Sequence, residues 1–347
     1  MRKGQSAITI KDVAREAGVG LMTVSRVING VPGKKYSEAT AERVRQAIER
    51  LGYEPNQVAR SLRGRRTGVI GLVTTSIVDP FWASCARGVE LEARERNYVP
   101  ILMASDENCE IEERQVAALQ GRRVDGLLLA ATPRLHRTTL IARLASIPTV
   151  ALDRPIAGVK TDCVMIDNEA AAAEATRHLI QHGHRRIAFV GYHPRIYTVQ
   201  KRTIGFVAAM NEAGLEGIVR TIGITAAPIY DLVREILSGR NRPTAIFATN
   251  TMTMQRVLQA ARDLGLAIPG DLAVTGFEDF AWAGLVEPGL TVVRQPGEEM
   301  GRRAAQLLFD RLGGQKGPTQ RVILESELVI RESCGCTKRP AVTAVSA

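Results

Sequence analysis

The sequence lacks any apolar run long enough to cross a membrane. Its longest runs, such as residues 126–131, fall far short of the roughly 20 residues that a spanning helix needs. No apolar stretch follows Arg2 and Lys3, so no signal peptide is predicted. The five cysteines, at positions 85, 109, 163, 334 and 336, form no paired framework, which fits a reducing compartment. We therefore expect a cytoplasmic protein that makes no membrane contact.

Motifs of nucleotide enzymes and hydrolases are also missing. No Gly-x-Gly-x-x-Gly or phosphate loop follows an expected strand, and no Gly-x-Ser-x-Gly elbow is present. His182 and His184 have no carboxylate or cysteine close by in the sequence and are interpreted as surface histidines at a helix end. Cys334 and Cys336 could ligate a metal or oxidise, but an incidental pair is the preferred interpretation. We expect no cofactor, no metal and no catalytic residue.

The charge that is present is unevenly distributed. Residues 1–66 hold 14 Lys/Arg against 6 Asp/Glu, a net charge of +8 out of +10 for all 347 residues. A basic segment on a near-neutral body predicts contact with a polyanion such as the phosphate backbone of DNA, although a merely solvated arm would have the same composition. With 45% apolar residues, the chain is expected to form a small domain followed by a large one.

Three short amphipathic helices are predicted in the basic segment. Their apolar faces are Ile10, Val13, Ala14 and Ala17; Val24, Val27 and Ile28; and Val44, Ala47, Ile48 and Leu51. A glycine-containing break at residues 18–20 lets the first two helices meet steeply, as in a helix-turn-helix whose second helix enters the major groove. A three-helix interaction bundle would have the same periodicity.

The second of these helices carries the side chains expected to contact DNA. Leu21 and Met22 occupy the positions of base readers, and their apolar character suits thymine methyl groups better than guanine edges. The other residues on the same side, which can reach bases or phosphates, are Thr23, Ser25, Arg26 and Asn29.

From residue 68 the pattern changes to alternating strands and helices. The predicted strands are residues 69–73, 101–104, 126–130, 149–152, 164–166, 187–191, 218–222, 245–248 and 273–277. Short apolar runs separated by amphipathic stretches, such as residues 81–97, favour parallel sheets covered by helices on both sides. Roughly 270 residues of this pattern predict two sheets, and hence two lobes with a cleft. Because parallel sheets bind ligands beyond the carboxyl ends of their strands, the loops that follow should line this cleft.

Three segments of the head, residues 8–14 (ITIKDVA), 23–30 (TVSRVING) and 51–56 (LGYEPN), together resemble the lactose/galactose repressor (LacI/GalR) family of bacterial transcriptional regulators. Residues 58–62 (VARSL) resemble the hinge helix of that family, which folds on operator DNA. The resemblance implies that Asn56 belongs to the DNA-binding set and that Leu62 wedges into the minor groove at the dimer axis and kinks the duplex. For Leu62, an ordinary contact between two hinge helices is the alternative.

The resemblance extends through residues 188–191, 243–248 and 291–296, and so covers roughly residues 8–332. It implies a body similar to periplasmic sugar-binding proteins, whose polar and aromatic side chains suit a sugar or sugar acid. The effector-binding residues carried over in this way are Asp79, Phe81, Trp82, Asp153, Arg154, Arg202, Asn250, Glu278 and Gln295. Taken singly, each could be structural: Asp153 could pair with Arg154, and Phe81 could belong to the core.

Several positions depart from the family pattern. Gly20 replaces the usual Ser or Thr that caps the recognition helix, a cap worth about 1 kcal/mol. The loop at residues 31–36 is longer than in many members, and its Lys34 and Lys35 either contact phosphates or are simply solvated. Thr251 replaces an aspartate, and Glu278 stands where a shorter aspartate commonly contacts sugar hydroxyls. Neither the operator nor the effector can therefore be taken from a relative.

The sequence thus predicts a small all-α helix-turn-helix head and an α/β two-lobed, periplasmic-binding-protein-like domain with parallel sheets. The expected parts are a DNA-binding domain (8–52), a hinge helix and linker (53–67), an effector-binding domain (68–332) and a flexible tail (333–347). We expect a homodimeric regulator, a repressor, on a near-palindromic double-stranded operator, whose DNA affinity changes when the effector binds. The tail lacks a leucine heptad that would assemble four chains. Whether ligand releases or recruits DNA stays open.

Two other classes of protein fit parts of the sequence. The body alone would suit a transport-type sugar-binding protein, but the missing signal peptide and the basic head argue against that. An α/β enzyme could use Asp153 or Glu278 as a base and would turn over a small polar metabolite, whereas a sensor binds saturably without product. The head favours the regulator over both.

Overall fold

The computed structural model describes residues 8–29, 36–53, 66–133, 138–223 and 227–336. It divides into two compact units, Met1–Thr67 and Gly68–Ala347, which are described separately here as the head and the body. The predicted contacts of Asn56 and Leu62, most of the hinge, and the tail beyond residue 336 lie outside the described residues. Lys34 and Lys35 do so too.

The described residues of the head form the three expected helices, α1 (Ile10–Ala17), α2 (Leu21–Asn29) and α3 (Glu38–Leu51). At the start of α1, the backbone N–H of Thr9 donates to the Asp12 carboxylate over 2.9 Å, which is one half of a capping box. Gly18 ends α1 at φ 63°, and this left-handed conformation, which glycine adopts at low cost, turns the chain toward α2. The helices share a small core formed by Val13, Ala14, Ala17, Val24, Val44 and Ala47.

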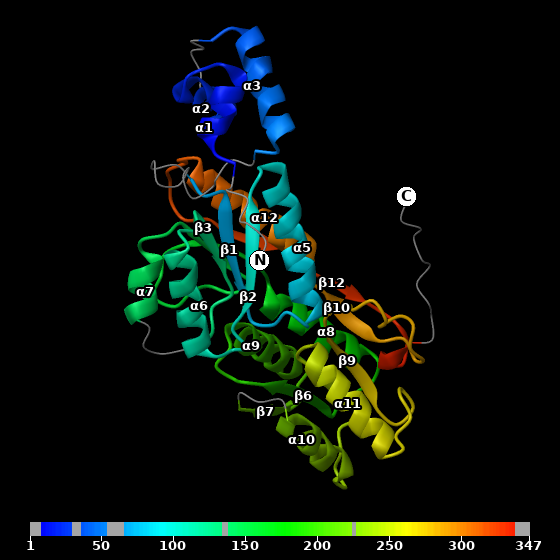
Figure 1. Cartoon of the computed structure of the whole chain (residues 1–347). Coiled ribbons are helices and arrows are strands. Elements are labelled where there is room, and N and C mark those ends of the chain that lie inside the picture. The colour runs from blue at the N-terminus through cyan, green and yellow to red at the C-terminus, as the bar shows by residue number, and fades with distance from the viewer. Residues whose placement is uncertain (1–7, 30–35, 54–65, 134–137, 224–226, 337–347) are drawn as a thin grey trace, which may run out of the picture. The chain divides into compact units, whose positions relative to one another are not determined.

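The body contains two sheets, as predicted, and each has six strands within the described residues (Figure 1). All strands of the first sheet are parallel, in the order β11-β5-β4-β3-β1-β2. Their bounds are β1 Val69–Thr74, β2 Val99–Ala104, β3 Gly126–Leu129, β4 Thr149–Leu152, β5 Asp162–Ile166 and β11 Arg321–Leu324. The second sheet has the order β12-β10-β9-β8-β6-β7 and is parallel except that β12 runs antiparallel to β10. Its bounds are β6 Ile187–Tyr192, β7 Ile218–Ile222, β8 Ala245–Ala248, β9 Ala273–Phe277, β10 Thr291–Arg294 and β12 Glu327–Val329.

Helices cover both faces of each sheet, so that the inner strands are buried on two sides, whereas the edge strands β2, β7, β11 and β12 are partly exposed. The first sheet lies between one pair of helices, α5 (Pro80–Glu95) and α12 (Gly297–Leu312), and another, α6 (Cys109–Gly121) and α7 (Thr138–Leu144). On the second sheet, α8 (Asn168–Gln181) and α9 (Tyr197–Glu212) cover one face. The other face is covered by α10 (Ala227–Ser238) and α11 (Thr251–Asp263). None of the helices in the described part of the chain is long and apolar enough to span a membrane.

The chain passes between the two sheets three times. It leaves the first sheet after β5 to enter α8, returns after β10 to enter α12, and crosses again between β11 and β12. Each lobe is therefore built from separate stretches of sequence. The strands β10, β11 and β12 were not predicted; β11 and β12 are edge strands with half-exposed side chains, and hence lack the continuous apolar pattern that marks the inner strands.

Two glycines hold α12 close against α5. A Cβ atom on Gly88 would lie 1.9 Å from the carbonyl oxygen of Glu298, and one on Gly301 would lie 2.0 Å from that of Cys85. No larger residue fits at either position without moving a helix. This close approach fixes the start of α5, where three of the predicted effector residues lie, relative to α12, which begins directly after Gln295 and Pro296.

Candidate functional site

A cavity of about 540 Å³ lies between the two lobes of the body, at the carboxyl ends of strands from both sheets. Its size is within the range of roughly 300–1,000 Å³ that is usual for small-molecule sites. The structure brings all nine predicted effector residues to its wall: Asp79, Phe81, Trp82, Asp153, Arg154, Arg202, Asn250, Glu278 and Gln295. Lining residues that the sequence did not single out include Glu107, Tyr192 and Trp282.

Two of the lining residues are also helix caps. Asp79 precedes α5, and its Oδ1 accepts a hydrogen bond from the N–H of Phe81 over 3.0 Å. Asn250 precedes α11, and its Oδ1 accepts from the N–H of Thr253 over 2.9 Å. Each side chain thus satisfies a helix N-terminus and borders the cavity at the same time, because both helices start where a strand has just ended.

The two carboxyl residues directly after β4 and β9 adopt a backbone conformation that is rare for residues other than glycine. Asp153 has φ 71° and Glu278 has φ 87°. Such positions cost about 1–3 kcal/mol each and cluster at ligand sites, where the surrounding structure holds them in place. The turn at each strand end directs the chain around the cavity, and both side chains are buried in its wall.

Arg154 forms a buried ion pair across the cavity wall. Its Nη2 lies 2.7 Å from Oε1 of Glu107, whereas its Nε is 4.0 Å from the carboxylate of Asp153, so Glu107 is its hydrogen-bonded partner. Nε and Nη1 of Arg154, and Oε2 of Glu107, are buried and have no hydrogen-bond partner within the described residues. An unmatched buried polar group costs about 1–3 kcal/mol, so these atoms favour a polar ligand.

Arg202, on α9, is buried and donates three hydrogen bonds. The acceptors are Oδ1 of Asn168 at 2.7 Å, the carbonyl oxygen of Thr249 at 2.6 Å and Oε1 of Gln295 at 3.3 Å. Burial lowers the pKa of Arg202 to about 10, which still leaves the guanidinium charged at neutral pH. Asn168 and Gln295 lie where the chain passes between the lobes, so Arg202 connects the cavity to two of these crossings.

Gln295 links Arg202 to Glu278. Its Nε2 donates to Oε2 of Glu278 over 2.8 Å, while its Oε1 accepts from Arg202. Burial raises the pKa of Glu278 to about 8, so this carboxyl is mostly protonated at neutral pH and can donate as well as accept. Burial also raises the pKa of Asp153 and of Asp79.

Aromatic rings and carboxyl groups dominate the rest of the wall. Phe81 and Trp82 meet edge-on at 4.9 Å and are each only 6% exposed, so Phe81 is a core residue that also borders the cavity. Trp282 is 38% exposed and lies with its ring centroid 4.0 Å from that of Phe280. Among the described residues, five carboxyl residues and two arginines line the cavity, and this excess of acidic groups makes the described wall electronegative.

The lining residues Glu107, Tyr192 and Trp282 were not predicted from the sequence, and each of them follows or ends a strand. Glu107 comes shortly after β2, and Tyr192 ends β6, so the rule that ligands lie beyond strand ends could have found both. Trp282 lies farther along the loop after β9, where no periodic pattern indicates which way a side chain points.

The head presents a different surface, at the start of α2. Leu21 is 45% and Met22 is 67% exposed, whereas Val24, one turn on, is fully buried in the head core. Thr23, Ser25 and Arg26 are half-buried, and the side chain of Asn29 lies outside the described residues. The N–H groups of Thr23 and Val24 bond to the carbonyl oxygen of Gly20, so the helix begins as predicted but without a capping side chain.

A helix-turn-helix with exposed side chains on its second helix, attached to a two-lobed body with a ligand cavity, defines the class of ligand-binding transcription regulators. Comparison with known proteins agrees. Residues 9–56 match the family described as bacterial regulatory proteins, lacI family, and residues 176–334 match the periplasmic binding protein-like domain. The HTH-type transcriptional regulator CelR of Thermobifida fusca is 37% identical over 340 residues, which cover 94% of this chain and 98% of that protein. The ribose operon repressor of Escherichia coli is 34% identical over 330 residues, covering 94% and 99%.

Solved structures show the same relationship. The transcriptional regulator CelR–cellobiose complex is similar over 94% of this chain and 99% of that one, with a TM-score of 0.69 and 35% identity. The structure of the lac repressor dimer bound to operator is similar over 95% of this chain and 99% of that one, with a TM-score of 0.84. At 24% identity it shows the common fold. The chain belongs to the lacI family of bacterial regulatory proteins. It is a DNA-binding transcriptional regulator rather than an enzyme, as the sequence predicted.

Proposed function

We propose that this protein is a homodimeric repressor whose two heads bind the half-sites of a near-palindromic operator and whose DNA affinity changes when a neutral sugar binds the cavity of the body. Residues 8–52 read the DNA, residues 53–67 act as the hinge, and residues 68–332 sense the sugar. The exposed first turn of α2, with Leu21 and Met22, supports the base contacts. The protein acts in the cytoplasm, because its DNA partner is there.

The nine lining residues that gather at one cavity carry this proposal, and the charges around them favour a neutral sugar over a sugar acid. Even with Glu278 protonated, four carboxylates face two guanidinium groups. An anionic ligand would add to this excess of negative charge, whereas hydroxyl groups donate to carboxylates and accept from Arg154. The volume suits a mono- or disaccharide. The relatives agree in class, since one is seen with cellobiose and another is a ribose operon repressor.

The layout of the cavity indicates how sugar binding would reach the hinge. Its walls come from both lobes, and Arg202 also contacts the crossings at Asn168 and Gln295. A ligand that touches both lobes favours one relative orientation of the lobes. It shifts the equilibrium between two such orientations only if it binds one of them more tightly than the other. The hinge, residues 53–67, follows α3 and leads into β1 of the first lobe. A movement of that lobe would therefore change how the two hinges of a dimer meet.

The test is fluorescence anisotropy of the full-length protein on a pool of palindromic duplexes, with and without cellobiose, ribose or gluconate. The informative variant is Asp153→Asn, because Asn removes the charge and tolerates positive φ; the matched control is Asp231→Asn on the exposed surface of α10. We expect one duplex to bind far more tightly than random DNA. A neutral sugar should change that affinity in the wild type and in the control but not in Asp153→Asn.

Three outcomes would contradict parts of the proposal. A protein that prefers no duplex over random DNA would overturn the operator-reading head. A response to gluconate alone would overturn the neutral sugar. Light scattering that shows a monomer at micromolar concentration with the duplex present would overturn the dimer.

A further inference from the structure

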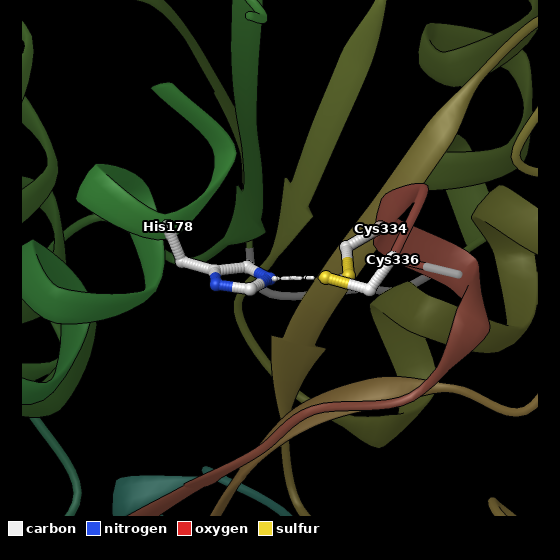
Figure 2. Close-up of side chains that lie close together, drawn as sticks. All are labelled: His178, Cys334 and Cys336. Atoms are coloured by element: carbon white, nitrogen blue, oxygen red, sulfur yellow. Dashed lines mark hydrogen bonds between the residues drawn. The ribbon is translucent and has the colours of Figure 1, made fainter. Parts of the chain in front are cut away.

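Three potential metal ligands from distant parts of the sequence meet in the second lobe. Nε2 of His178, Sγ of Cys334 and Sγ of Cys336 all lie within 4.8 Å of one another (Figure 2). His178 projects from α8, and the two cysteines lie on the segment after β12, at the end of the short helix η1 (Glu332–Cys334) and just beyond it. This cluster is separate from the effector cavity, since none of the three residues lines it.

The distances within the cluster are those of ligand atoms that converge on one point. Nε2 of His178 is 3.1 Å from Sγ of Cys334 and 3.6 Å from Sγ of Cys336. A second imidazole belongs to His182, the residue that caps the C-terminus of α8 one turn after His178, and its Nε2 is 2.8 Å from Sγ of Cys336. The two residues are spaced i, i+4, which places them on the same face of the helix. Two nitrogen and two sulfur ligands are thus at hand.

We propose that His178, His182, Cys334 and Cys336 form a structural site for a tetrahedral transition metal ion, Zn²⁺. Two imidazoles and two thiolates are a standard ligand set for structural zinc, and this set of soft and nitrogen ligands disfavours Mg²⁺ and Ca²⁺, which take oxygen. Bond lengths of roughly 2.0–2.1 Å to nitrogen and 2.3 Å to sulfur require nitrogen–sulfur separations of about 3.5 Å. The separation of 3.6 Å has about this value, and those of 3.1 Å and 2.8 Å need to widen by about 0.4 Å and about 0.7 Å.

The surroundings orient these ligands. Nδ1 of His182 lies 2.8 Å from the carbonyl oxygen of His178, and because a carbonyl can only accept, Nδ1 carries the proton and Nε2 presents its lone pair toward Cys336. The hydroxyl of Thr291 lies 3.1 Å from Sγ of Cys334 and can donate to the thiolate. Such outer contacts fix the tautomer and direction of metal ligands. Gly335, at φ 92°, makes the turn that lets both cysteines face α8.

The location explains what the ion would do. Cys334 is fully buried beside Thr291, which opens β10, and the far end of that strand leads to Gln295 in the effector cavity. The metal site therefore lies at the opposite end of β10 from the cavity. An ion there would tie the segment after β12 to α8 and so hold the edge strand β12 in place. Binding releases the two thiol protons and involves no oxidation: Zn²⁺ and two S–H groups give two Zn–S bonds and two H⁺.

The experiment uses the full-length protein, reduced and stripped of metal, titrated with Co²⁺ as a spectroscopic probe and then with Zn²⁺. We expect one equivalent of Co²⁺ per chain, with a thiolate-to-cobalt charge-transfer band and the intense visible bands of tetrahedral Co²⁺, both removed by Zn²⁺. Zn²⁺ should also raise the melting temperature. The double variant Cys334→Ser/Cys336→Ser should lose the charge-transfer band and the thermal shift, while Cys109→Ser, a cysteine outside the cluster, should retain both.

Because Cys334 is buried, its replacement could destabilise the fold whether or not a metal binds, so a second variant that leaves Cys334 in place is needed. His182→Gln changes an exposed side chain at the end of α8, and it should keep the charge-transfer band but weaken Co²⁺ binding at least tenfold. The proposal is overturned if the wild type shows no thiolate band with Co²⁺, or if the double cysteine variant binds like the wild type. Isolation of the protein under non-reducing conditions with a Cys334–Cys336 disulfide and no metal would also overturn it.

Discussion

The guanidinium of Arg202 stacks on the ring of Phe277, with Cζ 3.6 Å from the ring centroid. With its Cζ over the face of the ring, the guanidinium still donates hydrogen bonds in three directions, toward Asn168, Thr249 and Gln295. Only a planar, rigid cation can stack and donate in this way, so the position calls for arginine. Since two of the acceptors lie where the chain passes between lobes, the side chain that helps to line the cavity also contacts two of the crossings that connect the lobes.

Replacing Arg202 by lysine tests this arrangement. We expect Arg202→Lys to lower affinity for the sugar by more than tenfold and to abolish the effect of sugar on DNA affinity, because an ammonium group cannot reproduce the stack and the three directed bonds. DNA affinity without sugar should stay within about twofold, as the head is untouched. The control is Arg177→Lys, where the arginine is exposed and pairs with Glu212 on the surface. Unchanged sugar affinity in Arg202→Lys would contradict the role given to this residue.

The raised pKa of Glu278 predicts how stability depends on pH. The carboxyl has a pKa of about 8 in the folded protein, against about 4.3 for an exposed glutamate, so between these values the folded chain holds a proton that the unfolded chain has lost. This group therefore lowers the free energy of unfolding by about 1.4 kcal/mol per pH unit as pH rises from about 5 to 7.

Glu278→Gln removes this titration and should gain stability relative to the wild type as pH rises. Urea denaturation at pH 5 and pH 7 measures the difference, with Glu325→Gln, an exposed glutamate, as the control. If the difference in free energy of unfolding between Glu278→Gln and the wild type is the same at pH 5 and pH 7, the carboxyl is ionised in the folded protein.

In the head, substitutions of exposed side chains should affect DNA binding, and substitutions of buried side chains should affect stability. Met22→Ala and Leu21→Ala remove exposed side chains, so each should cost about 1–2 kcal/mol in preference for the operator over random DNA and leave the melting temperature unchanged. Val24→Ala lies in the same helix but opens a cavity in the small core, and should destabilise the head by about 2 kcal/mol. Anisotropy with specific and random duplexes, together with thermal melts, tests all three; loss of stability in Met22→Ala would place that side chain in the core instead.

The two tryptophans of the chain both line the cavity, so intrinsic fluorescence reports sugar binding directly. Trp282→Ala should weaken sugar binding about tenfold without lowering the melting temperature, since that ring is 38% exposed. Trp82→Ala should lower stability by about 3–5 kcal/mol, because that ring belongs to the core. If sugar leaves the fluorescence unchanged in the wild type while shifting DNA affinity, the sugar binds elsewhere.

The features that the sequence predicted well are those set by local rules. Apolar runs such as residues 187–191 located the inner strands, and parallel strands place their following loops at one edge, which is why residues as distant as Asp79 and Gln295 could be assigned to one cavity. The helix-turn-helix followed from apolar periodicity and Gly18.

The features that could not be predicted from the sequence depend on contacts between segments that are distant in the chain. The partner of Arg154 turned out to be Glu107 rather than its neighbour Asp153, because side-chain direction after a strand is set by the turn. The cysteines near the C-terminus looked incidental because the histidines that face them are more than 150 positions earlier. Edge strands such as β11 alternate between exposed and half-buried residues and resemble loops.

The last crossing of the chain has a consequence for protein synthesis. The strands β11 and β12 are neighbours in sequence, yet each completes the edge of a different sheet, so the first sheet has all its described strands only after residue 324 and the second only after residue 329. The helices α1 to α3 of the head are complete when residue 53 emerges, and domains made first generally fold first. A product that ends before residue 321 would therefore carry the three described helices of the helix-turn-helix but lack the last edge strand of both sheets, so premature termination separates the DNA-reading part from a complete sugar-sensing part.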